Sequence, residues 1–295
     1  MRICAIILAA LAASTLDWSG SAHAATAPAE QRLAHISIVS EGAGSPVVLI
    51  PGLSTPRAVW NGVSGELARN HRVILVQVNG FGGDEPGENL EPGVLAGVVS
   101  DLHSYLAAQK LGPAKIVGHS LGGLVALQLA KAHPEDASAL MIVDSLPYVG
   151  DIFVPGATVA QIEPQAKIMR DQIVASYGKG DAAVAQRTAS TMALTSPAQA
   201  KVAVWIGKAD ARVSGEAMYE DLTTDLRPDM ASINTPITLV FPYSAAMPKE
   251  RAEPFYHGEY AKAPHVTFVP VADSGHFVML DQPQAFAAAL DAFVK

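Results

Sequence analysis

Ser120 is flanked two residues away on each side by a glycine, in the order Gly118, Ser120, Gly122. A short apolar run precedes this segment and a long run with helical apolar spacing follows it, which places the serine on a turn between a strand and a helix. So sharp a turn strains the serine backbone and leaves room only for glycine on either side. Free N–H groups at the start of the helix favour negative charge at the same point. Ser120 is therefore predicted to be a nucleophile.

A serine hydroxyl is protonated at neutral pH, so the nucleophile needs a base within hydrogen-bond distance. The chain has nine histidines. His276 follows the last predicted strand and precedes the run Leu280 to Pro283, which begins the final predicted helix. The other histidines lie in the N-terminal apolar segment, within or at the end of helices, beside Ser120, or away from the carboxyl end of a strand. His276 is the predicted base.

The run from Gly118 to Gly123 and the Gly275-His276 segment resemble the nucleophile elbow and the histidine loop of the α/β-hydrolase superfamily. The resemblance implies a doubly wound, mostly parallel sheet with Ser120 as nucleophile. It also implies an oxyanion hole made by the backbone N–H groups of Leu53 and Leu121. Pro51 stands where many relatives carry a histidine.

The triad acid departs from the usual pattern. In the superfamily it commonly follows the strand predicted at 236–241, where this chain has Ser244. Some members place it after the preceding strand, and Asp144 stands at that strand end. A buried carboxylate is costly without a partner, and His276 is the partner at hand. Asp144 is therefore the predicted acid; the alternatives are Glu250, Glu253, Asp273, or a dyad without an acid.

The elements that carry these residues follow from apolar runs. Each candidate site residue named above lies at the carboxyl end of a predicted strand, as expected for a ligand site in a doubly wound sheet. The predicted strands cover 35–39 (an edge strand), 47–50, 72–78, 114–119, 139–143, 236–241 and 265–269. Helices are predicted at 56–70, 95–109, 121–132, 250–261 and 284–294.

Between residues 146 and 235 the strand pattern disappears. Helical patterns cover 165–177, 181–194, 197–209 and 215–226, separated by glycine, proline and polar clusters. An all-helical insertion at this place resembles the cap that many superfamily members carry over the site. The predicted organisation is thus a first core part at 25–145, a helical cap at 146–235 and a second core part at 236–295.

Residues 1–24 have the features of a secretory signal. Arg2 supplies the charged start, Ile3 to Leu16 the apolar segment, and Ala22-His23-Ala24 the cleavage site. The apolar segment is too short to span a bilayer, so a periplasmic or secreted protein is expected, with no membrane span after cleavage. The only cysteine is Cys4, so the mature form has no disulfide and no thiol chemistry.

The formal net charge is −8, and the cleaved form keeps it because Arg2 and Asp17 cancel. Without a run of Lys or Arg, an acidic chain is a poor candidate for binding nucleic acid or anionic membranes. No set of His, Asp and Glu shows metal-ligand spacing, so neither a metal nor a cofactor is expected. Oligomeric state is left open.

The expected function is that of an exported carboxylesterase- or lipase-like serine hydrolase, acting on a small or medium hydrophobic ester or lactone through an acyl-enzyme on Ser120. Serine-dependent carbon–carbon hydrolases, haloperoxidases and aminopeptidases remain as alternatives. For an aminopeptidase, the candidates to hold the substrate amine are Glu163, Glu216 and Glu220. A ligand-binding protein that has lost catalysis is the alternative from another class.

Overall fold

The computed structural model describes residues 29–295. The predicted export signal at residues 1–24 lies outside the described residues. Within them, no helix is both long enough and apolar enough to cross a bilayer.

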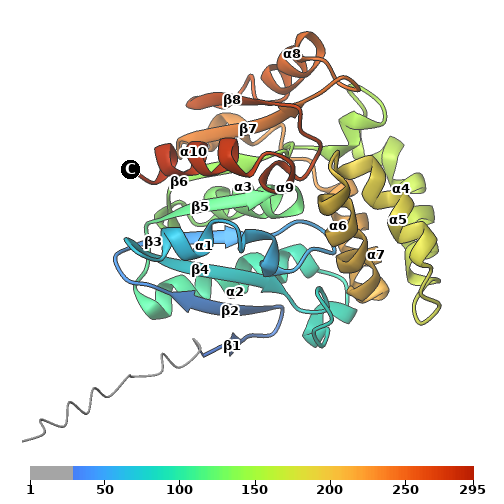
Figure 1. Ribbon diagram of the computed structural model, residues 1–295, viewed down its shortest axis with the longest axis horizontal. Helices are drawn as coiled ribbons and strands as arrows, with labels where there is room; N and C mark the ends of the chain where they lie inside the picture. Colours follow the sequence, from blue (N-terminus) through green and yellow to red (C-terminus); the bar gives the residue numbers. More distant parts are fainter. Residues whose placement is uncertain (1–28) are drawn as a thin grey trace, which may run out of the picture.

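Eight strands form one sheet in the order β1-β2-β4-β3-β5-β6-β7-β8 (Figure 1). β1 and β2 pair antiparallel, as do β2 and β4, and the remaining pairs are parallel. The predicted doubly wound, mostly parallel sheet is thus confirmed. The strands are β1 (Gln31–Arg32), β2 (Ile36–Glu41), β3 (Ser45–Ile50), β4 (His71–Val78), β5 (Ala114–His119), β6 (Ala137–Val143), β7 (Ile237–Tyr243) and β8 (Val266–Ala272).

The predicted edge strand, residues 35–39, is not at the edge. It is β2, and the two-residue strand β1 pairs along its outer side. So short a strand has no apolar alternation to reveal it, because both of its residues are polar and exposed.

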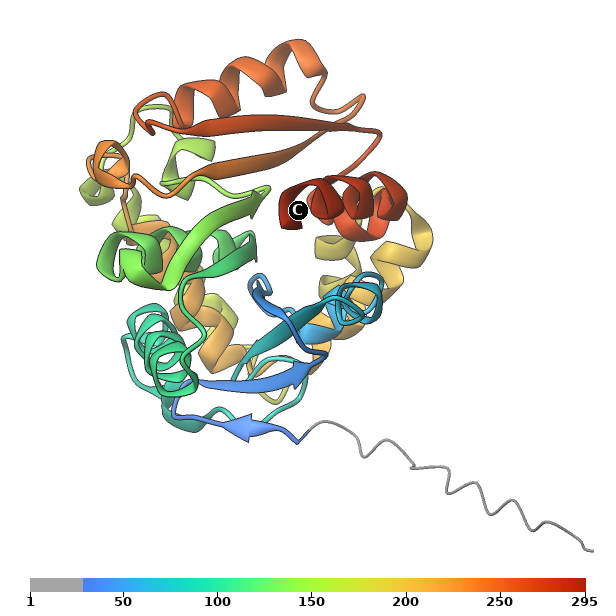
Figure 2. The same cartoon turned by 90° about the vertical axis from the view of Figure 1, so that its left-hand side faces the viewer.

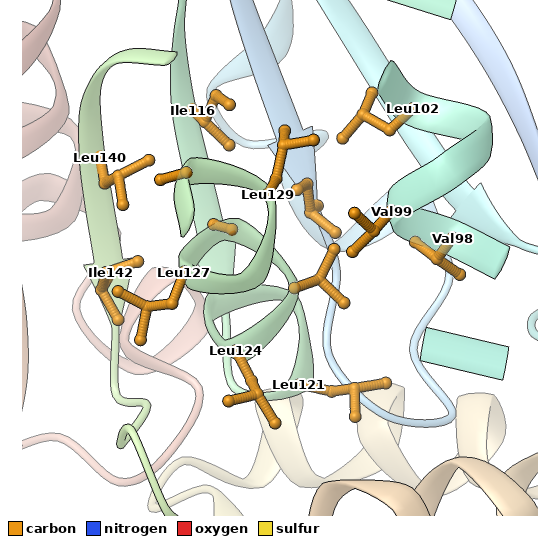
Figure 3. Close-up of a cluster of buried hydrophobic side chains, with 14 of the residues drawn as sticks. Val98, Val99, Leu102, Ile116, Leu121, Leu124, Leu127, Leu129, Leu140 and Ile142 are labelled. Atoms are coloured by element: carbon orange, nitrogen blue, oxygen red, sulfur yellow. The ribbon is translucent and has the colours of Figure 1, made fainter. Parts of the chain in front are cut away.

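Side chains of the central strands alternate between two buried layers. Val47 and Leu49 of β3 belong to one apolar cluster, and Val48 and Ile50 to the other. This is the period of two that a strand imposes, and both faces are apolar because helices cover both. Figure 2 shows these helices on either side of the sheet, and Figure 3 shows the layer that α3 and α2 share with Ile116, Leu140 and Ile142.

Helices α2 (Val94–Gln109), α3 (Leu121–Ala132) and α8 (Lys249–Glu259) cover one face. The other face carries α1 (Ser64–Leu67), α9 (Val278–Asp281) and α10 (Pro283–Val294). The helix predicted over 56–70 is instead a 3-10 turn η1 (Arg57–Trp60) followed by the short α1. Asn61 and Gly62 separate the two, and both residues favour turns over helix interiors.

The chain between β6 and β7 holds four α-helices: α4 (Val159–Val174), α5 (Ala182–Met192), α6 (Ser196–Lys208) and α7 (Ala211–Thr223). They gather beside the sheet (Figure 1, yellow). α4 begins six residues before the predicted start at 165 because Thr158 and Gln161 form a capping box ahead of it. Pro164 is the sixth residue of the helix and leaves the carbonyl of Ala160 without its usual backbone donor.

Asp281 ties this helical segment to the loop that carries His276. Its buried carboxylate accepts hydrogen bonds from the backbone N–H groups of Leu194 and Thr195, between α5 and α6, at 2.9 to 3.1 Å. It also accepts from the N–H of Gly275 at 3.0 Å. One carboxylate therefore fixes the histidine loop against the helices.

We expect Asp281→Asn to lower the free energy of unfolding by about 2–4 kcal/mol. The amide NH₂ of the asparagine would face at least one of these backbone N–H donors. In addition, each hydrogen bond to a charged group contributes about 1.5–3 kcal/mol. Urea unfolding followed by circular dichroism measures the change. The exposed Asp291 is the matched control, and Asp291→Asn should stay within about 0.5 kcal/mol. Equal stability of the two variants would contradict the role given to Asp281.

Candidate active site

Ser120 sits on a strained turn between β5 and α3. Its φ and ψ are 54° and −124°, in a region that residues with a side chain rarely adopt, at a cost of about 1–3 kcal/mol. A Cβ at Gly118 would lie 2.2 Å from the carbonyl oxygen of Gly122, and one at Gly122 would lie 2.4 Å from that of Ile50. The two glycines are thus a steric requirement of the turn. Ser120 itself stays partly exposed.

Asp144 and His276 meet across the carboxyl ends of β6 and β8. The Nδ1–H of His276 donates to Oδ2 of Asp144 at 2.7 Å. A carboxylate only accepts hydrogen bonds, so the proton of the neutral ring is on Nδ1 and Nε2 keeps a free lone pair. The His276 side chain is 27 % exposed and can be reached from solvent, whereas Asp144 is 13 % exposed. The pair has the orientation that a general base needs.

Tyr256 on α8 holds the other oxygen of the same carboxylate. Its hydroxyl donates to Oδ1 of Asp144, and its ring stacks on Phe241 with centroids 4.8 Å apart. Burial, followed by the charge of Asp144, raises the pKa of Tyr256 well above its usual value, so the hydroxyl stays a donor at neutral pH. Sequence reasoning missed this residue, since helical periodicity identifies Tyr256 only as a core position.

We expect Tyr256→Phe to lower kcat on an activated ester about 10–100-fold with little change in KM, because a hydrogen bond to a charged group contributes about 1.5–3 kcal/mol. Tyr256 touches Asp144 and not the reacting atoms, so it is a positioning residue. Steady-state kinetics checks the split between kcat and KM. The neighbouring Tyr260, whose hydroxyl donates to the carbonyl of Ser145 at 2.9 Å, provides the control: a larger kcat loss in Tyr260→Phe would argue against the role of Tyr256.

The other acids considered for His276 do not reach it. Ser244 follows β7 and its backbone N–H donates to the carbonyl of Met247 at 2.9 Å. Glu250 and Asp273 are exposed and Glu253 is partly so. Within residues 29–295, Asp144 is the only carboxylate that forms a hydrogen bond or an ion pair with His276.

His119 links the nucleophile turn to the histidine loop. It directly precedes Ser120, is fully buried, and its Nε2–H donates to the backbone carbonyl of His276 at 2.9 Å. The two rings lie 4.6 Å apart between centroids. Burial, then the charge of His276, lowers the pKa of His119 to about 3, which keeps it neutral. In the part of the chain that the structure describes, the Ser120 hydroxyl makes no hydrogen bond, and such bonds often tighten only when substrate binds.

Leu53 and Leu121 flank Ser120 on two different segments. Leu121 opens α3, so its N–H has no partner inside the helix. A Cβ at Gly52 would lie 3.0 Å from Cβ of Ser120, so the segment leading to Leu53 packs directly on the serine. No hydrogen bond among residues 29–295 uses the N–H of either leucine. The two N–H groups predicted to form an oxyanion hole thus belong to segments that adjoin Ser120, and both are free of hydrogen bonds.

The loop after β3 also contacts the helical segment. The Ser54 hydroxyl donates to that of Ser214 on α7 at 2.8 Å. Asp221 lies two turns further along α7 and is partly buried. Burial raises the pKa of its carboxyl to about 7, and the charge of His276 acts to lower it. Asp221 could not be singled out from the sequence, because a charged residue in a helix normally belongs to the solvent-exposed face.

The three glutamates considered for a substrate amine are engaged elsewhere. Glu163 pairs with Lys167 at 2.8 Å, and Glu216 lies 3.9 Å from Arg170. Glu220 accepts three backbone N–H bonds at the start of α2.

Two solved structures share this fold over most of their length. A thermophilic esterase from Thermogutta terrifontis superposes with a TM-score of 0.74 at 21 % identity, covering 90 % of this chain and 98 % of the other. The enol-lactonase from Burkholderia xenovorans gives 0.71 at 15 % identity, with 88 % and 96 % covered. At such identities the likeness concerns the fold.

A curated relative is closer in sequence but over a shorter segment. The pimeloyl-(acyl-carrier protein) methyl ester esterase of Aeromonas hydrophila is 37 % identical over 112 residues, which is 38 % of this chain and 42 % of the relative. The match thus spans less than half the length of that relative. The model of the alpha/beta hydrolase family matches residues 47–289. This match covers most of β3, strands β4 to β8, the turn at Ser120 and His276. The chain therefore belongs to the alpha/beta hydrolase family.

Proposed function

We propose that the protein is a serine hydrolase that cleaves small or medium hydrophobic carboxylic esters or lactones through an acyl-enzyme on Ser120. The observation that carries the proposal is the 2.7 Å bond from His276 Nδ1–H to Asp144, which leaves Nε2 of His276 free as a base. The strained turn at Ser120 and the family membership support it.

In the proposed mechanism, His276 Nε2 takes the proton of Ser120 as the serine oxygen attacks the substrate carbonyl carbon. The N–H groups of Leu53 and Leu121 stabilise the resulting oxyanion. The imidazolium, stabilised by Asp144, then protonates the departing alcohol, and an acyl-enzyme remains. Water, activated by the same nitrogen, hydrolyses this ester and restores Ser120.

The preference for hydrophobic groups rests on the side chains next to His276. Trp205 of α6 lies 6.3 Å from Phe277, measured between ring centroids. Met192 and Ile206 pack in the same apolar cluster. An acyl or alcohol group bound here would contact mainly apolar surface.

A panel of p-nitrophenyl esters of increasing chain length, run beside a set of lactones, tests the proposal. We expect turnover of at least one class, with kcat/KM highest for short or medium chains. An enzyme that turns over neither class and is not labelled by a fluorophosphonate would instead be a non-catalytic member of the fold.

Asp221 carries a charge that changes near neutral pH and acts on His276. Below about pH 7 its carboxyl is neutral, and above that pH it is an anion. Two p-nitrophenyl esters of the same shape test this effect: the cationic 4-(trimethylammonio)butanoate and the uncharged 5,5-dimethylhexanoate. We expect the kcat/KM of the cation, divided by that of the uncharged ester, to rise about tenfold between pH 6 and 8. This rise is equivalent to about 1.4 kcal/mol. The ratio cancels the titration of His276, which both substrates share.

Asp221→Asn should make this ratio independent of pH. Glu216→Gln is the matched control, since it removes a carboxylate from the same helix that is paired with Arg170, and it should keep the wild-type profile. A ratio that stays flat in the wild-type enzyme would contradict an effect of the Asp221 charge on the bound substrate.

We also propose that residues 1–24 direct export, on the basis of their charged, apolar and Ala-x-Ala segments. Mass spectrometry of the mature protein from the periplasm or medium should give an N-terminus at Ala25. A cytoplasmic protein that keeps Met1 would contradict export.

A further inference from the structure

Three side chains with metal-binding atoms meet near the amino end of β6, away from Ser120. They are His103 on α2, His133 at the end of α3, and Glu135 on the 3-10 turn η3 (Pro134–Asp136). One ligand atom from each lies within 4.8 Å of the other two. β6 starts directly after η3 and ends directly before Asp144. At about 3.3 Å per residue, the seven-residue strand places this cluster roughly 23 Å from the proposed triad.

Asp136 orients His103 for ligation. The Nδ1–H of His103 donates to Oδ2 of Asp136 at 2.8 Å, and the Asp136 side chain is only 4 % exposed. The neutral ring therefore presents the free lone pair of Nε2. A carboxylate behind a histidine whose other nitrogen is free is the arrangement that commonly supports a metal-bound imidazole, because it fixes the ring and raises its basicity.

His133 and Glu135 supply the remaining donors. The rings of His103 and His133 are stacked at 3.6 Å and 10°, and Nδ1 of His133 lies 3.6 Å from Oε1 of Glu135. Around one tetrahedral ion, ligand atoms are roughly 3.3 Å apart for metal–ligand bonds of about 2.0–2.1 Å. In two stacked rings the nitrogen lone pairs point in parallel planes and do not converge. The His133 ring therefore has to rotate before both imidazoles can bind one ion. The His133 side chain is 30 % exposed and that of Glu135 is 64 % exposed, so both can be reached from solvent.

We propose that His103, His133 and Glu135 form a binding site for Zn²⁺, with Asp136 as the residue that positions His103. Two imidazoles and one carboxylate are the donors that Zn²⁺ prefers, whereas Ca²⁺ and Mg²⁺ require oxygen ligands. Water completes the tetrahedron on the exposed side. The ion joins α2 to the connection between α3 and β6, so it stabilises the fold and takes no part in ester cleavage.

Titration of the untagged protein with Zn²⁺ against a chromophoric chelator tests the site. We expect one equivalent to bind, and the temperature of half-unfolding to rise with it. His103→Ala and Glu135→Gln should each weaken binding by at least tenfold. Glu135 is exposed, so its replacement keeps the fold intact even if removal of His103 disturbs it. Asp136→Asn should weaken binding about 10–100-fold.

His265→Ala is the control, because His265 is an exposed histidine outside the cluster, and it should bind Zn²⁺ as the wild type does. The proposal is overturned if the wild-type protein binds no Zn²⁺, or if Glu135→Gln and His265→Ala bind it equally. Ser120→Ala should keep the site, so zinc binding and ester hydrolysis succeed or fail separately.

Discussion

Ser120→Ala is expected to lower kcat on a p-nitrophenyl ester by about 10⁶-fold, the loss seen when a serine nucleophile is removed from a triad. No other group replaces its oxygen, so only the oxyanion donors and substrate binding continue to accelerate the reaction. Labelling by a fluorophosphonate probe should vanish with the activity. Steady-state kinetics and gel fluorescence measure the two effects.

The loss of activity has to be separated from a loss of fold. Alanine keeps the Cβ atom, so Ser120→Ala retains the strain of a φ of 54°, whereas Ser120→Gly relieves it. We therefore expect both variants to be inactive, and Ser120→Gly to be the more stable by about 1–3 kcal/mol. Ser244→Ala is the matched control and should keep both labelling and turnover. Persistent labelling of Ser120→Ala would place the nucleophile elsewhere.

The central strands and the turn at Ser120 were predictable because local sequence determines them. The run from Val47 to Ile50 is apolar throughout, and only helices on both faces of a sheet make such a strand favourable. Gly118 and Gly122 are required by contacts within a few residues of Ser120 or with the neighbouring strand. Asp144 could be inferred from its place after a strand, since a charge at that point needs a partner.

Residues that depend on tertiary packing could not be found in this way. Tyr256 has the spacing of a core residue, and the direction of its hydroxyl depends on how α8 packs against β7. His103 and His133 are thirty positions apart in the sequence and meet because α2 and α3 cover the same face. The spacing of His133 and Glu135 alone gives no metal signature, because the third ligand atom of the cluster comes from a different helix.

Asp144→Asn is expected to lower kcat by about 10⁴-fold, as removal of the triad carboxylate does in serine proteases. The structure supplies the reason. Tyr256 donates its hydroxyl proton to Oδ1, so it selects the carbonyl oxygen of the new amide and turns the NH₂ group toward His276. Nδ1 of His276 must then accept, the ring proton moves to Nε2, and no lone pair remains to take the proton of Ser120.

This account predicts how Asp144→Asn combines with Tyr256→Phe. Without the hydroxyl, the amide is free to rotate and present its oxygen to Nδ1–H of His276, which restores the tautomer with a free Nε2. The double variant should therefore be more active than Asp144→Asn alone, although Tyr256→Phe lowers activity in the wild-type background. Additive losses in the double-mutant cycle would contradict the tautomer argument. Glu250→Gln and Glu253→Gln are the controls: if either lowers kcat as much as Asp144→Asn does, the acid has been assigned to the wrong residue.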